Sequence, residues 1–544
     1  MIPKPHFLAQ EAAPAASPKG APRPWWEGRP FVAAMILLAF VPLLWPAIPP
    51  LVDLGGHMGR YKVALDGADS ATLQQWFSFR WLPIGNLGVD LLVVPLAKLI
   101  GLEPATKLVI LLIPPLTVAG MLWVAREVHN RLPPTVAFAL PLAFSHPFMF
   151  GFVNYSLSLA LALVAFGLWL RMGRLGATRL RAALFVPISF IIFFAHTFGW
   201  GVLGLLAFSA EAVRQHDRGR SWWLSGLRAA MHAAALALPL LMVLAWRSEA
   251  TGGMTDRWFQ WDYKGEYLMR VLRDRWEAFD IASAAIVAAV PLFALIHPRL
   301  TLSRNLAFSG LVLAAGFILL PRVIFGSAYA DMRLAPIMAA IFILAIRFKA
   351  ETKFPLARWL AVAAVGFMLV RLIGTTASTT IAWQHQRQQL GAVNHIQRGA
   401  RVAVMVWDQC EQWRLRRSDH LGSLALVRKE AFVNDQWPLV GSSLLTVDYP
   451  AAKWFRADPS QIVRDRGCSH EGWPIDLALR AVPKAAFDYL WLLDMRPIPR
   501  AWVNGWTPIW SGEGSILLKR AANLNRGAAA LPPATRRTAS APAR

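Results

Sequence analysis

The chain has 544 residues, of which 56% are hydrophobic and only 16% are charged, and its mean hydropathy is +0.41. Soluble domains carry about a quarter charged residues, so this composition excludes both an ordinary cytosolic enzyme and a disordered protein. The formal net charge of +24 favours cytoplasmic loops that face anionic membrane lipids. Because the basic residues are spread along the chain, nucleic-acid binding has little support. We interpret the sequence as an integral membrane protein.

The N-terminal residues 1–30 are polar and rich in alanine and proline, and we expect them to be disordered and cytoplasmic. The apolar run Phe31–Leu51 then follows at membrane-spanning length. This run is too long for a signal-peptide core, and no small-residue cleavage site follows it. It therefore predicts a retained membrane anchor.

Further apolar segments lie at about 86–101, 107–125, 135–150, 152–170, 182–210, 229–247, 279–297, 305–321, 334–348 and 359–378. By the positive-inside rule, the basic loops 126–131, 171–181, 214–228, 299–304 and 347–358 should all be cytoplasmic. Two adjustments make this consistent. The stretch 182–210 becomes two passes that meet at His196 on the outer side, and 86–101 becomes a half-depth or interfacial helix. The transmembrane part, residues 31–380, then has about eleven crossings.

The chain changes character after residue 380. Residues 401–407, 424–428 and 489–493 are typical of short β-strands, and 509–520 of a hairpin around two glycines. We expect residues 381–520 to form a soluble α/β domain on the extracytoplasmic side, followed by a disordered tail, 521–544. Cys410 and Cys468 both lie in this region; they are compatible with one disulfide outside the cytoplasm, or with free thiols inside it.

Polar residues of the first outer loop form the leading candidate site. Asp53 lies at the end of the first membrane segment, and His57 and Arg60 follow one and two helical turns later. A carboxylate backed by cations suits a reaction in which a hydroxyl loses a proton and a phosphate leaves. The alternative is an interfacial loop whose charges simply face water, but ionisable residues at membrane depth are costly to retain.

Other outer segments add candidate substrate-binding residues. Arg333 could clamp a phosphate, although Asp331 and Arg333 could equally pair with each other. His196 is at the apex of the broken pass, where it is either a core residue or part of the site. Trp258 and Trp261 suit stacking on a sugar, although aromatic residues also anchor membrane interfaces.

These stretches resemble the GT-C class of membrane glycosyltransferases, which includes protein O-mannosyltransferases and the aminoarabinose transferases of lipid A. The resemblance covers about residues 31–380. It is carried by Asp53 after the first helix, the segment Gly151–Ala160, the break at His196 and the Asp-x-Arg-x-x-Pro pattern of residues 331–336. It implies a polyprenyl-phosphate-linked sugar donor bound from the bilayer, an acceptor entering from the outer side, and the first-loop acid as base in an inverting transfer.

Asp53 has no adjacent second acid, whereas many members of the class have one. Asp66, Asp69 and Asp90 are alternatives among which the sequence does not select, so no metal is assigned and a divalent ion is left open.

The resulting hypothesis is a glycosyltransferase of the bacterial inner membrane that acts on its periplasmic side, with a glycan, lipid or protein as acceptor and membrane lipids as partners. Asp53 and His57 would be catalytic. The alternative is a polysaccharide or lipid transporter, or an assembly partner without catalysis; a transporter should have charges deep in several helices and symmetric halves.

Overall fold

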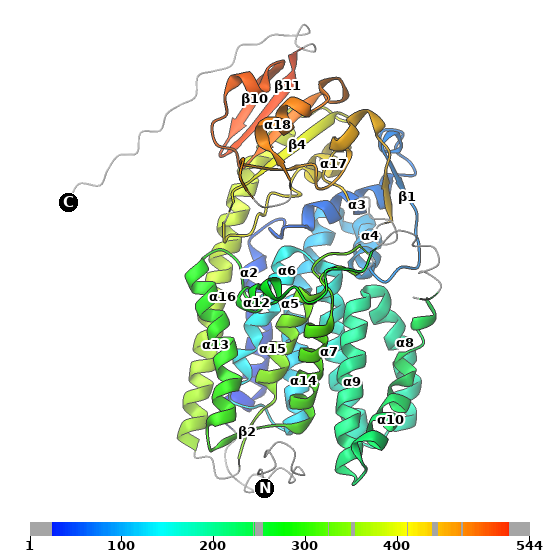
Figure 1. Ribbon diagram of the computed structural model, residues 1–544, viewed down its shortest axis with the longest axis vertical. Helices are drawn as coiled ribbons and strands as arrows, with labels where there is room; N and C mark the ends of the chain where they lie inside the picture. The colour runs from blue at the N-terminus through cyan, green and yellow to red at the C-terminus, as the bar shows by residue number, and fades with distance from the viewer. Residues whose placement is uncertain are drawn as a thin grey trace, which may run out of the picture.

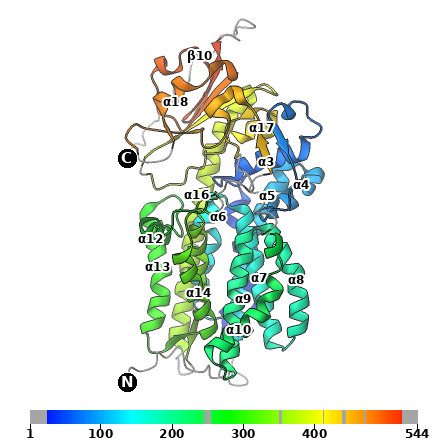
Figure 2. The same cartoon turned by 45° about the vertical axis from the view of Figure 1, so that its right-hand side comes forward.

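The computed structural model describes residues 24–242, 244, 254–324, 326–349, 354–410, 412–437, 444–468 and 472–521. Long helices form a bundle, and an α/β unit sits on one end of it, so the molecule is elongated (Figure 1). A rotated view shows the same two parts stacked along the long axis (Figure 2). Residues 1–23 and 522–544, for which we predicted disorder, lie outside the described residues. Residues 24–30 depart from that prediction, because Trp25–Glu27 forms the short 3-10 helix η2 just before the bundle begins.

The bundle is built from apolar helices that run between its two ends. They are α1 (Arg29–Leu38), α2 (Val41–Leu44), α5 (Leu102–His129), α6 (His146–Phe150), α7 (Val153–Arg174), α8 (Thr178–Ala195), α9 (Thr197–Asp217), α10 (Trp222–Ala233), α13 (Glu277–Ile296), α14 (Arg304–Leu319), α15 (Leu334–Leu344) and α16 (Phe354–Gln389). Shorter helices α3 (Leu54–Asp66), α4 (Gly88–Ile100) and α12 (Trp261–Met269) lie where the bundle meets the α/β unit (Figure 1).

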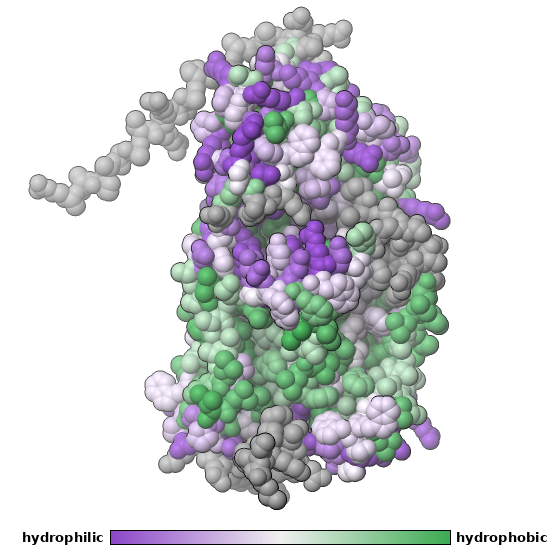
Figure 3. Space-filling model, in the orientation of Figure 1, coloured by the Kyte–Doolittle hydropathy of each residue, from purple (hydrophilic) through white to green (hydrophobic). Residues whose placement is uncertain are grey.

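Five of the described helices are long and apolar enough to cross a membrane, at residues 102–129, 153–174, 178–195, 277–296 and 355–395. Shorter apolar helices cover residues 29–44, 136–150 and 304–319. Hydrophobic residues dominate the visible surface of the bundle, whereas hydrophilic residues gather over the α/β unit (Figure 3). The protein is therefore a helical membrane protein with a C-terminal α/β unit. The number of membrane crossings, about eleven, stays a prediction.

The stretch 182–210 is broken as the sequence predicted. Helix α8 ends at Ala195, His196 has extended backbone angles, and α9 starts at Thr197. Two backbone groups at the break form hydrogen bonds with the neighbouring segment 85–87. The carbonyl of Phe194 accepts from the N–H of Leu87 at 2.8 Å, and the N–H of Thr197 donates to the carbonyl of Gly85 at 3.0 Å. Such pairing is what permits irregular backbone within a membrane bundle.

The predicted half-depth segment is also a separate short helix. Helix α4 has 13 residues, or about 20 Å at 1.5 Å per residue, which is short of the roughly 30 Å hydrocarbon core. The end of the bundle remote from the α/β unit holds the α9–α10 connection and the paired strands β2 (Leu300–Leu302) and β3 (Ile346–Phe348) (Figure 1). The described residues of three basic loops, 214–228, 299–304, 347–349 and 354–358, therefore share one end, in agreement with the sidedness argument.

The α/β unit is built on a mixed sheet. Its strands are β4 (Arg401–Asp408), β5 (Phe432–Val433), β7 (Ile462–Arg464), β8 (Trp473–Pro474), β9 (Tyr489–Leu493), β10 (Trp506–Gly512) and β11 (Ser515–Arg520), with helices α17 (Ser423–Lys429) and α18 (Ile475–Ala481). The path β10-β11-β9-β4-β7-β8 is extended by β5, which pairs with β4. Strand β4 is parallel to β5, β7 and β9, and nearly all of its residues are buried, as expected of a central parallel strand.

The strands predicted at 401–407 and 489–493 and the hairpin near the C-terminus are confirmed. The strand predicted at 424–428 is wrong, because those residues lie in α17. Its Leu-Ala-Leu core and its terminal Arg and Lys are strong helix formers, and this outweighs the short apolar run that suggested a strand. Cys410 and Cys468 form a disulfide, whereas free thiols were the other alternative left by the sequence.

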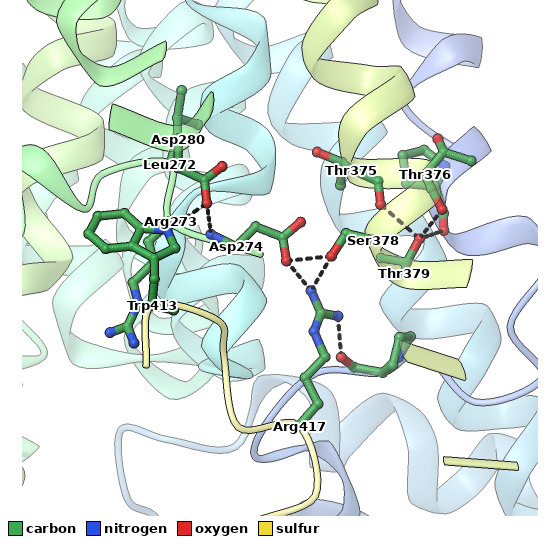
Figure 4. Close-up of polar contacts among 12 residues, drawn as sticks. Leu272, Arg273, Asp274, Asp280, Thr375, Thr376, Ser378, Thr379, Trp413 and Arg417 are labelled. Atoms are coloured by element: carbon green, nitrogen blue, oxygen red, sulfur yellow. Dashed lines mark hydrogen bonds and ion pairs between the residues drawn. The ribbon is translucent and has the colours of Figure 1, made fainter. Parts of the chain in front are cut away.

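Strand β1 (Phe77–Phe79) and Arg417 make two of the connections between the α/β unit and the rest of the chain. Strand β1 pairs antiparallel with β6 (Leu445–Val447), so an early and a late segment share one ladder. Arg417 of the α/β unit forms an ion pair with Asp274 and donates to the Pro50 carbonyl, while Ser378 of α16 donates to the same carboxylate at 2.8 Å (Figure 4). The unit is thereby anchored to three separate parts of the bundle.

Candidate active site

Asp53 is held in place by the chain that precedes α7. Its N–H donates to the carbonyl of Phe150 at 2.9 Å, and its own carbonyl accepts from His57 one turn into α3 at 3.1 Å. Gly151 has a φ of +104°, and a Cβ there would lie 2.7 Å from the Asp53 nitrogen. Only glycine fits this close approach. The Gly151 segment singled out in the sequence therefore serves to position Asp53.

The buried carboxylate of Asp53 faces His420 of the α/β unit. The distance from His420 Nε2 to Asp53 Oδ1 is 3.8 Å, and the same nitrogen lies 3.8 Å from Oδ1 of Asp458. The other ring nitrogen, Nδ1, is 2.7 Å from the carbonyl of Asp435. Trp437 packs against the ring, with centroids 4.2 Å apart. The first outer loop and the C-terminal unit thus share one acid–base cluster.

Burial controls the ionisation of this cluster. It raises the pKa of Asp53 well above its usual value, and the negative charges of Asp458 and Asp419 raise it further, while Arg333 and Arg416 oppose them. Burial also raises the pKa of Asp419, to about 7. A carboxylate with a raised pKa is a stronger base than an exposed one, which suits it to removing a proton from a hydroxyl.

Arg333 is a buried guanidinium with unused hydrogen-bonding capacity. Its Nη1 donates to the carbonyl of Ala328 at 3.1 Å, while Nε has no hydrogen-bond partner among the described residues. The group lies over the rings of Phe152 and Phe198, at 4.4 and 5.4 Å. Burial lowers its pKa to about 10, so the group stays protonated at neutral pH. Arg333 lies over Phe152, and the preceding residue, Gly151, packs against Asp53, so the cation and the base belong to the same buried region.

His196 reaches the same region through Tyr155. Its Nδ1 accepts from the N–H of Phe198 at 3.0 Å and so caps α9, and its ring lies 6.0 Å from that of Tyr155. The Tyr155 hydroxyl donates to the Arg333 carbonyl at 2.5 Å. His196 therefore supports the backbone that carries Arg333, and its predicted contact with substrate stays a prediction.

His57 lies on the α3 turn that follows Asp53. Its ring stacks on Tyr61 with centroids 6.2 Å apart and packs against Trp437 at 5.2 Å. Burial lowers its pKa well below the usual value, and the positive charge of Arg60 adds to this. His57 is thus a neutral group beside the base, and its Nδ1 is without a hydrogen-bond partner in the described part of the chain.

Arg60 points away from the base toward α4. Its Nη2 donates to Asp90 at 2.8 Å in a buried ion pair, and Asn154 donates to the same carboxylate oxygen at 3.0 Å. Asn154 also accepts from the N–H of Val89 at 2.6 Å. Helices α3, α4 and α7 are joined here by a buried polar network. The sequence predicted Arg60 as a phosphate ligand, and that role would require breaking its ion pair with Asp90.

Asp331 does not pair with Arg333. Its carboxylate instead binds Lys264 of α12 at 3.0 Å, and Lys264 also donates to the carbonyls of Phe317 and Leu320. Trp258 and Trp261 are exposed near the start of α12. Asp331 thus ties α12 to the segment that bears Arg333, and the two Trp side chains remain accessible on the outer surface.

No group of three or more His, Cys, Asp or Glu within the described ranges is placed to hold a metal ion. Asp90, one of the alternatives for a second acid, is occupied by Arg60 and Asn154. The acids that do accompany Asp53 are Asp419 and Asp458.

Comparison with solved structures identifies the fold. The crystal structure of apo ArnT, an aminoarabinose transferase from Cupriavidus metallidurans, aligns with a TM-score of 0.51 over 90% of this chain and 97% of its own. This chain has the ArnT fold. The alignment has 11% sequence identity, and it confirms at the level of fold the GT-C resemblance drawn from the sequence. The structure of the same ArnT bound to undecaprenyl phosphate aligns with a TM-score of 0.46, also at 11% identity, over 91% of this chain and 98% of its own. No protein-family model and no curated protein match the sequence.

The sequence did not point to Asp419, His420 or Asp458 as site residues. They lie in loops of the α/β unit, roughly 370 to 400 positions after Asp53. The Arg-Arg-Ser-Asp-His run of residues 416–420 was the available signal, because two cations, an acid and a histidine in one short loop are unusual on a plain surface.

Proposed function

We propose that this protein is a membrane glycosyltransferase that moves a sugar from a polyprenyl-phosphate donor to an acceptor hydroxyl. The observation that carries the proposal is that a buried base, Asp53, and a buried cation, Arg333, lie in the same region, on either side of the Gly151–Phe152 segment, at the end of the bundle that meets the α/β unit. The ArnT fold agrees with it, since ArnT is itself a transferase.

In the proposed reaction Asp53 removes the proton of the acceptor hydroxyl as its oxygen attacks the anomeric carbon. The bond from that carbon to the phosphate oxygen breaks on the opposite face, so the configuration inverts. The phosphate leaves with the electron pair, and Arg333 stabilises its negative charge through the free donor at Nε. Neutral His57, beside Asp53, supplies a further polar contact without competing for the proton.

The proposed location is the inner membrane of a bacterium, with the α/β unit in the periplasm and the N-terminus in the cytoplasm. The Cys410–Cys468 disulfide supports this, because disulfides persist in oxidising compartments. The basic loops at the opposite end of the bundle agree with a cytoplasmic face. The eleven crossings and the division at about residue 380 belong to the same proposal.

The test is Asp53→Asn in the full-length protein. Membrane vesicles from source cells, which contain the natural acceptors, are supplied with radiolabelled undecaprenyl-phosphate-linked sugars, and transfer of label is measured. We expect a fall of about 10²- to 10⁴-fold, the usual contribution of a general base. Asp66→Asn is the matched control, because Asp66 lies at the far end of the same helix and pairs with Lys62. Wild-type transfer by Asp53→Asn would refute the proposal.

A further inference from the structure

His420 is pressed against the helix that starts after Asp53. Gly55 and Gly56 face it, and a Cβ on Gly55 would clash with the His420 carbonyl, while one on Gly56 would lie 3.1 Å from its Nδ1. Two adjacent glycines therefore leave room for this histidine on α3. The fit is specific to the ring and its backbone, so the position of His420 relative to Asp53 is set by packing on both sides.

The hydrogen bonds of His420 determine which nitrogen is available. The Asp435 carbonyl can only accept, so Nδ1 at 2.7 Å must carry the hydrogen. The neutral ring then presents the lone pair of Nε2 to Asp53 and Asp458, each 3.8 Å away. Neither separation is a hydrogen bond, and a movement of about 1 Å would make either one. Catalytic hydrogen bonds commonly tighten only when substrate is bound.

The three side chains differ in their exposure to solvent. The side-chain exposures are 13% for Asp53, 5% for His420 and 23% for Asp458, so His420 is the most buried of the three and Asp458 the most accessible. Other charged or titratable groups near His420 are Arg416, His57, the neighbouring Asp419 and Asp435, whose carboxylate accepts from Ser423. Asp53, between the bundle and the α/β unit, is less exposed than Asp458, so a path through His420 leads its proton to the more accessible carboxylate.

We infer that His420 and Asp458 form a proton relay that removes the proton from Asp53 after each sugar transfer. The inference rests on the proposed function. The proton of the acceptor hydroxyl passes to the Asp53 carboxylate, then to His420 Nε2 to give the imidazolium, then to the Asp458 carboxylate, and finally to bulk water. Each step moves one proton and leaves the donor group in its starting form, so no other reactant is required.

The charges around His420 bear on the first of these steps. Burial raises the pKa of Asp53 and lowers that of His420, and both changes oppose transfer of the proton from Asp53 to His420. Asp458 and the bond to the Asp435 carbonyl partly restore the basicity of His420, and Arg416 reduces it. A relay works best between groups of similar proton affinity, because no step is then strongly uphill.

The decisive variant is His420→Asn. An asparagine amide can still donate to the Asp435 carbonyl, so the local fold is kept, but nothing replaces Nε2. We expect kcat for sugar transfer to fall by about ten- to a hundredfold while KM stays within about twofold. The acidic limb of the pH profile that belongs to His420 should disappear. Asp458→Asn should give a smaller fall. His297→Asn is the control, because His297 accepts from the Arg299 amide at the opposite end of the bundle.

Unchanged kcat and pH profile in His420→Asn would overturn the relay. A second measurement is independent of the sugar chemistry: the pH titration of carboxylic-acid infrared bands in purified full-length protein without substrate. His420→Asn should shift the titration of the band that Asp53→Asn removes, and an unshifted band also overturns the relay. If the wild-type protein transfers no sugar yet the band shifts, the proposed function fails and the acid–base coupling stands.

Discussion

The anchor between the α/β unit and the bundle gives the most quantitative prediction. Arg417 and Asp274 form an ion pair in which their side chains are 7% and 5% exposed. Replacing one partner of a buried pair costs about 3–5 kcal/mol, because a charge is left uncompensated. Asp274 would keep the hydrogen bond from Ser378. The loss of folding stability in Arg417→Met should therefore lie at the lower end of this range, about 3 kcal/mol.

That destabilisation should be visible as early unfolding of the α/β unit. For a cooperative unit of about 150 residues, about 3 kcal/mol corresponds to a fall of roughly 6–12 °C in Tm. The assay is tryptophan fluorescence of the full-length protein in detergent, heated at one fixed rate because membrane proteins often unfold irreversibly. Limited proteolysis at intermediate temperatures should release the unit from the bundle.

Two further variants separate the ion pair from general damage. Arg417→Met combined with Asp274→Leu removes both charges and should recover part of the lost stability. Arg466→Met removes an arginine whose side chain is 68% exposed and whose partner is Asp476 of the same unit. It should leave Tm unchanged. If Arg417→Met and Arg466→Met unfold at the same temperature, the anchor does not stabilise the molecule and the reasoning is refuted.

Two other predictions concern pH and helix packing. Because the pKa of Asp419 is raised to about 7 in the folded protein, its folded form binds a proton more tightly than its unfolded form, and this contribution to stability is lost as pH rises from about 4 through 7. Asp419→Asn should therefore raise Tm at pH 8 relative to wild type more than it does at pH 5, and an equal effect at both would contradict the assignment. Gly199→Ala should reduce the yield of folded protein, because a Cβ there would meet the Ser158 backbone carbon at 2.6 Å, whereas Gly204→Ala on the same helix, with open space around it, should fold normally.

The membrane part was predictable because its signals are local. Apolar runs of a given length and the distribution of arginines fix where the chain turns, and the mismatch between them located the break at His196. The short helix α4 followed from one proline and two charges in a short run. In the α/β unit the same logic gave β4 and β9 but misassigned α17, where a run of five residues did not distinguish helix from strand.

The site was only half predictable, because half of it comes from a distant part of the chain. Asp53 and Arg333 are conspicuous as charges beside apolar segments, and the structure brings them together. Arg60 looked equivalent to Arg333, yet Asp90 neutralises it, and Asp331 is neutralised by Lys264. Whether a charged residue forms an ion pair depends on which helices pack together, and a single sequence does not reveal that packing.

The ladder between β1 and β6 has a consequence for how the protein is made. Phe79 pairs with Leu445, and at about 5–20 residues per second the ribosome needs on the order of 20 to 70 s to synthesise the chain between them. For most of that interval Asp53 has reached the membrane, but the segment that carries His420 has not been translated. The candidate site therefore cannot assemble in the order of synthesis, because a nascent protein that stalls before that point contains Asp53 without His420.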